Sequence, residues 1–160
     1  EISTTPFLLY IVGGGSAAVL ERLKILIRSM NLMNEVKLLP QVSPTEIHRY
    51  FRSASAYLST SLYEPFGIVF IESMAAGLPI VALETGAVPE VVADTVGFVV
   101  QRGVHYIDRL AHRLKIIIEN AEVREFFATN GPLEAKQYDI GQHIDKFIAL
   151  YTSVLPKKNG

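Results

Sequence analysis

Short, mainly apolar runs alternate with segments of helical periodicity along most of this chain. Runs typical of strands buried on both faces occupy residues 7–12, 36–39, 56–59, 80–83 and 97–100. Apolar positions recur at helical spacing over 16–30, and two further helices are predicted at 43–53, from its capping residues, and from about 68 to 76, where an apolar run follows Gly67. Strands that alternate with helices in this way indicate βαβ units. The pattern therefore predicts an α/β fold, a doubly wound, Rossmann-like parallel sheet covered by helices on both faces.

Local residue types predict where the helices begin and end. Ser16 is a candidate N-cap, and Ser43-Pro44-Thr45-Glu46 combines a cap, a proline at the first helical position and an acid three residues after Ser43. Gly77 is expected to end the helix that begins near residue 68. Residues from about 106 to 155 are predicted to be helical, with breaks near Asn120 and at Gly131-Pro132, before a frayed tail at 156–160.

Two loops that follow predicted strands carry the candidate chemistry. Ligands of doubly wound sheets bind beyond the carboxyl ends of the strands. The Gly13–Gly15 loop follows the first strand and the Glu64–Gly67 loop follows the third. Both loops are therefore expected to open on the ligand-binding edge.

Glu64 and Glu72 are acids with seven residues between them, at a predicted helix start marked by Pro65 and Gly67. Free N–H groups and the helix dipole suit a helix N-terminus to a phosphate group. Two carboxylates beside such a site suit a ligand that also carries hydroxyl groups. A nucleotide sugar has both features, since the acids accept hydrogen bonds from its hydroxyls while backbone amides hold its phosphates.

Composition narrows the class of protein. The chain has 160 residues, of which 49% are hydrophobic and 19% charged, so we expect one compact domain over residues 1–160 rather than a disordered chain. A net charge of −1 argues against a nucleic-acid partner, and the absence of cysteine excludes disulfides and thiolate metal sites. No signal peptide and no apolar run of eighteen residues are found, so a cytoplasmic protein is expected.

Residues 61–92, SLYEPFGIVFIESMAAGLPIVALETGAVPEVV, resemble the nucleotide-sugar-binding half of retaining glycosyltransferases of family 4, which have the GT-B architecture. This family includes glycogen and sucrose synthases, and its Glu-x7-Glu signature is matched here by Glu64 and Glu72. The resemblance covers nearly the whole chain. It includes the Gly13-Gly14-Gly15 turn, the Gly86…Pro89-Glu90 turn and the C-terminal helices at about 105–155.

The resemblance implies a role for each matched position. Glu64 would be the catalytic residue that contacts the sugar hydroxyls of the donor, and Glu72 would bind the ribose. The other donor-binding positions would be Phe66, Gly67, Ile68 and Val69 through backbone amides, Gly13 and Gly15 through a close turn, and Leu39 and Gln41 beside the base. Pro40-Gln41 stands where the family usually has Gly followed by an aromatic residue. No metal and no cofactor are implied beyond the donor itself, a UDP-, GDP- or ADP-sugar.

The implied reaction moves a hexose to a saccharide or lipid acceptor with retention at the anomeric carbon. The implied partner is an N-terminal acceptor domain of the same polypeptide, through which any peripheral membrane contact would be made. Family members carry an Arg and a Lys upstream of the first matched strand, and this sequence starts after both. We therefore expect a donor-binding domain that is inactive alone.

Two other functions stay open at this point. One is a non-catalytic, regulatory or assembly module that only binds a nucleotide sugar. The other is a dehydrogenase, since Gly13-x-Gly15-x-x-Ala18 fits a relaxed dinucleotide fingerprint. The acid that should end the second strand is missing from Leu38-Leu39-Pro40-Gln41, which argues against the dehydrogenase. Three aromatic residues are candidates to stack on a base or sugar, Tyr57, Tyr63 and Phe66, although Tyr57 is expected in the core.

Overall fold

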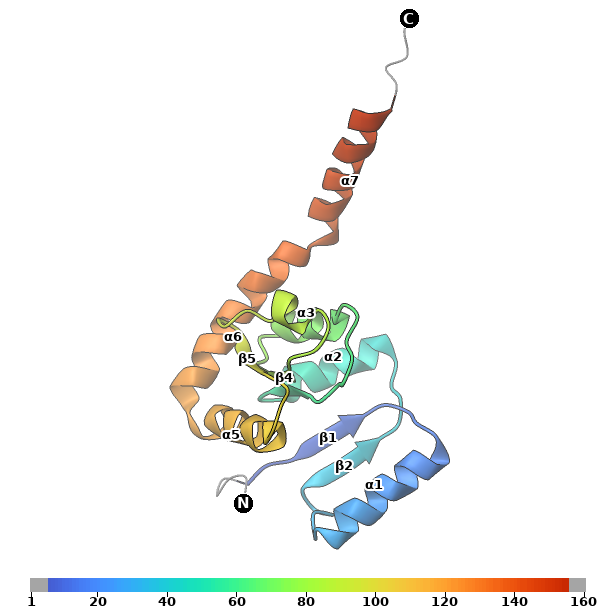
Figure 1. Cartoon of the computed structure of the whole chain (residues 1–160), viewed down its shortest axis with the longest axis vertical. Coiled ribbons are helices and arrows are strands. Elements are labelled where there is room, and N and C mark those ends of the chain that lie inside the picture. The colour runs from blue at the N-terminus through green and yellow to red at the C-terminus, as the bar shows by residue number, and fades with distance from the viewer. Residues whose placement is uncertain (1–5, 156–160) are drawn as a thin grey trace, which may run out of the picture. The chain divides into compact units, whose positions relative to one another are not determined.

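The computed structural model describes residues 6–155 (Figure 1). Its contacts group into two compact units, residues 1–50 and residues 51–160. The strands form one parallel sheet in each unit. The predicted α/β class is therefore confirmed, whereas the predicted single domain stays a prediction.

The first unit is built on one βαβ element. Strand β1 (Leu9–Val12) pairs in parallel with β2 (Val36–Leu39), and α1 (Ala17–Ser29) connects them. Ser16 caps α1 as predicted, because its hydroxyl accepts a hydrogen bond from the Val19 N–H at 3.3 Å.

Helix α2 (Pro44–Ser53) begins with the predicted capping box. The Ser43 hydroxyl accepts from the Glu46 N–H at 3.2 Å, and the Glu46 carboxylate accepts from the Ser43 N–H at 3.0 Å. The backbone and hydroxyl hydrogen bonds from Ser43 lower the pKa of Glu46. The sequence thus fixes the start of α2 through local side-chain chemistry.

The second unit contains a three-stranded parallel sheet in the order β3-β4-β5. Strand β3 (Tyr57–Ser59) leads through a loop to α3 (Ile68–Ala75), which precedes the central strand β4 (Ile80–Leu83). The short helix α4 (Val88–Val91) connects β4 to β5 (Gly97–Val100). The helices α5 (Tyr106–Glu119) and α6 (Ala121–Ala135) follow.

Strand β4 lies between two hydrophobic layers, and all four of its residues are buried. Ile80 and Ala82 belong to a cluster with Phe70 and Met74 of α3 and with the valines of α4. Val81 and Leu83 belong to a second cluster with side chains of α5 and α6, namely Leu110, Ile117 and Phe127. Since alternate residues of a strand point to opposite faces, helices cover both faces of this sheet, as predicted.

The C-terminal helices differ from the prediction at one point. The break near Asn120 is confirmed, because the Asn120 side chain accepts from the Val123 N–H at 3.1 Å and caps α6. The break at Gly131-Pro132 is wrong, since α6 continues through both residues to Ala135. A 3-10 turn, η1 (Lys136–Tyr138), then leads to α7 (Ile140–Val154), and the predicted tail at 156–160 lies outside the described residues.

Within residues 6–155, no helix is both long enough and apolar enough to cross a membrane.

Candidate functional site

Glu64 and Glu72 flank the start of α3 in the second unit. Strand β3 ends at Ser59, and Glu64 lies on the loop that follows it. Helix α3 begins at Ile68, so Glu72 lies just over one turn into the helix. Both acidic residues are half-buried. The structure thus places the two predicted acids on the predicted loop and helix.

Gly67 makes the turn between these two acids. Its backbone is left-handed, with φ +85° and ψ +47°, and it is the residue immediately before α3. A Cβ atom at this position would lie 2.4 Å from the ring of Phe70. The positive φ and the buried Phe70 ring therefore require glycine here, whether or not a ligand approaches.

Neither carboxylate has a hydrogen-bond or ion-pair partner among residues 51–155. A half-buried carboxylate gains from donors that replace its lost water. Burial raises the pKa of the Tyr57 hydroxyl, and the charge on Glu64 raises it further, with a smaller effect from Glu72. Both acids therefore act electrostatically on one tyrosine, and both keep oxygen atoms available for a ligand with hydroxyl groups.

The residues around the acids divide into exposed and packed groups. Phe66 and Ile68 are 53% and 63% exposed, whereas Val69 packs against the core cluster of α3 and α4. The N–H groups of Ile68 and Val69 belong to the first turn of α3, where N–H groups have no intrahelical acceptor. Backbone donors and an exposed aromatic ring thus accompany the two carboxylates.

Tyr57 lies in the core, as predicted. Its ring makes edge-on contacts with Phe51 and Phe70, with centroid distances of 6.2 and 5.8 Å. Tyr63, in contrast, is 75% exposed.

The remaining predicted donor-binding residues lie together in the first unit, where β1 and β2 end. The Gly13 N–H donates to the carbonyl of Leu39 at 3.2 Å, which joins the glycine loop to the last residue of β2. Gly13 has φ +148°, a conformation that favours glycine. A Cβ atom on Gly14 would lie 3.7 Å from the Gln41 side chain. The structure therefore brings Gly13, Gly15, Leu39 and Gln41 to one end of the β1-β2 pair.

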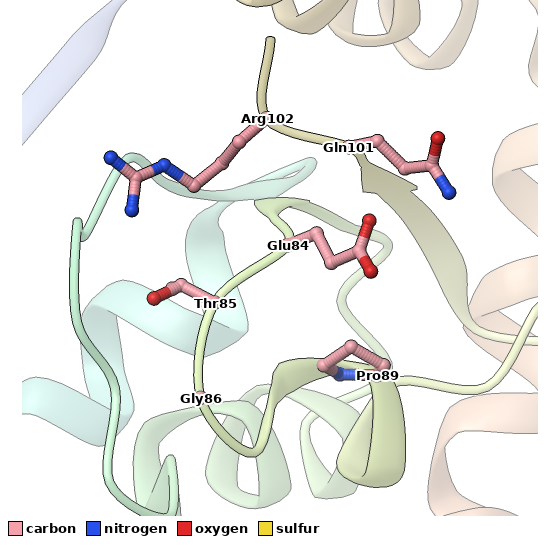
Figure 2. A pocket seen from close by; sticks show the side chains of 6 residues that line it. All are labelled: Glu84, Thr85, Gly86, Pro89, Gln101 and Arg102. Atoms are coloured by element: carbon pink, nitrogen blue, oxygen red, sulfur yellow. The ribbon is translucent and has the colours of Figure 1, made fainter.

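A pocket that was not predicted from the sequence lies at the carboxyl ends of β4 and β5. It has a volume of about 480 Å³ and is lined by Glu84, Thr85, Gly86, Pro89, Gln101 and Arg102 (Figure 2). Figure 2 shows the side chains of Glu84 and Gln101 pointing one way and those of Thr85 and Arg102 the other. Glu84 and Gln101 directly follow predicted strands. The rule that ligands bind beyond the carboxyl ends of the strands could therefore have predicted these two residues as lining a pocket.

The polar groups at this site are two carboxylates and the backbone N–H groups at the start of α3. In the part of the chain that the structure describes, no three His, Asp or Glu side chains are grouped to hold a metal ion. The second unit thus places two acids without partners among residues 51–155 at the start of a helix that follows a strand, the edge at which ligands of open α/β sheets bind.

Comparison with known proteins identifies the family. Residues 2–134 match the family described as "Glycosyl transferases group 1", and the chain therefore belongs to this family. This confirms the glycosyltransferase resemblance. D-inositol 3-phosphate glycosyltransferase of Nocardiopsis dassonvillei is 30% identical over 144 residues, which are 88% of this chain and 33% of that protein. The chain thus spans about a third of the length of this curated relative.

Solved structures agree with the α/β fold. Anabaena HepE in complex with UDP-glucose matches 92% of this chain and 41% of its own, with a TM-score of 0.79 and 29% identity. Sucrose-phosphate synthase of Thermosynechococcus elongatus matches 89% of this chain and 39% of its own, with a TM-score of 0.74 and 25% identity. The similarity to glycosyltransferases therefore extends from motif to fold.

Proposed function

We propose that this chain is the donor-binding part of a retaining glycosyltransferase, which moves a hexose from a nucleotide diphosphate sugar to a saccharide or lipid acceptor. Glu72 accepts hydrogen bonds from the ribose hydroxyls of the donor. Glu64 accepts hydrogen bonds from the sugar hydroxyls and orients the anomeric carbon. Backbone amides at residues 66–69 hold the diphosphate, and the β1-β2 end contributes Gly13, Gly15, Leu39 and Gln41 toward the nucleotide.

One observation carries this proposal above the others. Two half-buried carboxylates without partners among residues 51–155 flank the free N–H groups at the start of α3. A site made of carboxylates alone would repel a diphosphate. A site made for a phosphate alone would need the backbone amides and would have no use for two acids. A ligand with phosphate and hydroxyl groups satisfies both kinds of group at once.

The similarity to known proteins supports the choice of donor. The chain belongs to a glycosyltransferase family, and the similar HepE protein was crystallised with UDP-glucose. UDP-glucose is therefore the first donor to test, with GDP- and ADP-sugars as the alternatives. Because the chain spans about a third of its curated relative, we assign acceptor binding to a further, N-terminal domain of the same polypeptide.

Calorimetric titration tests donor binding. The protein is titrated with UDP, GDP and ADP and with their glucose or mannose conjugates, and the Glu72→Gln variant is compared with the wild type. Loss of charge-assisted hydrogen bonds worth about 1.5–3 kcal/mol predicts affinity roughly 10- to 100-fold weaker. Glu125→Gln is the matched control, because it removes one exposed carboxylate from α6.

The outcomes separate the candidate functions. Binding of one nucleotide family that weakens in Glu72→Gln and not in Glu125→Gln supports the donor site. Equal affinity in wild type and Glu72→Gln would contradict it. Kinetics of the full-length protein then separate an enzyme from a binding module, because Glu64→Gln should lower kcat in an enzyme, whereas a binding module has no turnover to lose.

A further inference from the structure

The loop that follows β4 supports the backbone at Glu64 and two residues before it. The Thr85 hydroxyl donates to the carbonyl of Leu62 at 2.8 Å. The Ala87 N–H donates to the carbonyl of Glu64 itself at 3.0 Å. Two hydrogen bonds from residues 85–87 therefore hold the acidic loop, one at Leu62 and one at Glu64 itself.

Gly86 lies between these two donors and touches the same carbonyl. A Cβ atom at Gly86 would lie 1.9 Å from the Glu64 carbonyl oxygen, and the backbone there has φ +50°. This oxygen is a backbone atom, so it cannot rotate away from a Cβ atom as a flexible side chain could. Any side chain at position 86 would push the acidic loop out of place, so the contact requires glycine.

The supporting loop is itself fixed at both ends. The Glu84 N–H donates to the Val100 carbonyl at 2.8 Å, which extends the β4–β5 ladder to the residue before Thr85. At the other end the Val88 N–H donates to the Thr85 carbonyl at 3.1 Å, and Val88 is only 1% exposed. The loop is thus anchored to the central sheet and to the buried start of α4.

The Glu64 carboxylate has no partner of its own among residues 51–155, so its position depends on its backbone. We propose that Thr85 and Gly86 are positioning residues, which set the place of the Glu64 carboxylate against the donor sugar. This inference rests on the proposed function, in which Glu64 contacts the sugar and Glu72 the ribose. Glu72 lies on α3, and neither bond from the 85–87 loop reaches it.

The test compares Thr85→Val with Thr85→Ser in the full-length protein. Valine keeps the shape of threonine and removes the donor, whereas serine keeps the hydroxyl. We expect Thr85→Val to lower kcat with UDP-glucose, or with whichever donor the wild type uses, about tenfold, because small misplacements of a reacting group are costly. The Kd of the free nucleoside diphosphate should change less than about threefold, and Thr85→Ser should restore kcat to near the wild-type value.

Thr95→Val is the matched control. The Thr95 hydroxyl also makes a long-range hydrogen bond, at 3.4 Å to the Glu134 carboxylate. Thr95 precedes β5 and so lies at the amino edge of the sheet, opposite the edge that carries Thr85. This variant should lower thermal stability at most and leave kcat within about twofold of the wild type.

Gly86→Ala gives a second measurement, with a larger expected fall in kcat of roughly a hundredfold. The inference is overturned if Thr85→Val keeps the wild-type kcat, if Thr85→Ser is as impaired as Thr85→Val, or if nucleoside diphosphate affinity falls as much as kcat. A different result would contradict the proposed function itself: the wild-type protein would bind no nucleotide, or the Glu72→Gln variant would bind the nucleotide with wild-type affinity.

Discussion

Tyr57 links the core of the second unit to the acidic site. Its ring packs against Phe51 and Phe70, while its hydroxyl is under the influence of both Glu64 and Glu72. Burial is the largest cause of its raised pKa, and the Glu64 charge is the next. A phenolate at this place would be poorly solvated and would face two negative charges, so the folded protein holds the proton tightly.

This predicts how stability depends on pH at residue 57. Above pH 10, the unfolded chain releases the Tyr57 proton while the folded protein keeps it. The stability that this proton provides is fully present below pH 10 and is lost as pH rises through the raised pKa. Tyr57→Phe should therefore reduce the fall in unfolding free energy above pH 10, by at most about 1.4 kcal/mol per pH unit.

Urea unfolding at several pH values between 8 and 11 measures this slope. Tyr151→Phe, at a 63% exposed position on α7, is the control and should leave the slope as in the wild type. An unchanged slope in Tyr57→Phe would show that the hydroxyl is not held protonated by its surroundings.

Glu64 and Glu72 could be predicted from the sequence, whereas the positioning residues Thr85 and Gly86 could not. Glu64 and Glu72 were predicted from seven intervening residues and a local Pro-Gly turn, and the structure places them on the predicted loop and helix. The roles of Thr85 and Gly86 could not be predicted in this way. Their contacts reach residues more than twenty positions earlier, and no local pattern encodes such a pairing.

At the scale of elements, α3 and α6 pack unusually closely. A Cβ atom at Gly131 of α6 would lie 2.8 Å from the Met74 carbonyl oxygen at the end of α3. At Gly77, just after α3, a Cβ atom would lie 3.2 Å from the Ala128 carbonyl of α6. Glycine at these two positions lets the backbones approach, and this contact holds α6 against the helix that carries Glu72.

Gly131→Ala is expected to destabilise the protein by about 1–2 kcal/mol. Alanine favours a helix over glycine by roughly 1 kcal/mol, but crowding of a packed interior costs about 1–3 kcal/mol. Crowding should win here because the opposing atom is a backbone oxygen. Urea denaturation measures the change, with Thr129→Ala, at an exposed position of α6, expected to stay within about 0.5 kcal/mol of the wild type. Increased stability in Gly131→Ala would show that α6 moves away from α3 at little cost.

The same contact explains the one wrong helix boundary. Glycine followed by proline usually marks the end of a helix, which is why a break was predicted at Gly131-Pro132. Pro132 removes the hydrogen bond to the carbonyl four residues earlier and its ring crowds that carbonyl, yet α6 continues to Ala135. Packing against α3 overrides the local preference, and a sequence pattern contains no information on that packing. The capped helix starts at Ser16, Ser43 and Asn120 were predictable because the capping groups are local.

At the scale of the whole molecule, the two units differ in how many hydrophobic side chains each one buries. Val36 is the one buried residue among residues 6–50, and α1 has none. The second unit has two hydrophobic clusters, which lie on the two faces of β4. The four residues of β4 are at most 1% exposed. The α/β class was predictable from the strand and helix pattern and the family from the motif at residues 61–92, whereas this difference between units depends on packing.

Unequal burial predicts unequal hydrogen exchange. Segments with few buried apolar contacts open locally at low free energy, whereas core strands exchange only through global unfolding. Backbone amides of β4 are therefore expected to exchange slowest. Those of α1 should have protection factors at least about a hundredfold lower than those of α5, a helix of similar length that buries Leu110 and Ile117.

Native-state exchange followed by NMR or mass spectrometry measures these protection factors. Comparing α1 with α5 removes any effect of secondary-structure type, because both are α-helices with internal hydrogen bonds. Comparable protection in α1 and α5 would contradict the prediction, since it would mean that residues 6–50 unfold together with the core around β4. A difference confined to residues 6–50 would locate the most easily opened part of the protein in the first unit, which includes the glycine loop proposed to contact the nucleotide.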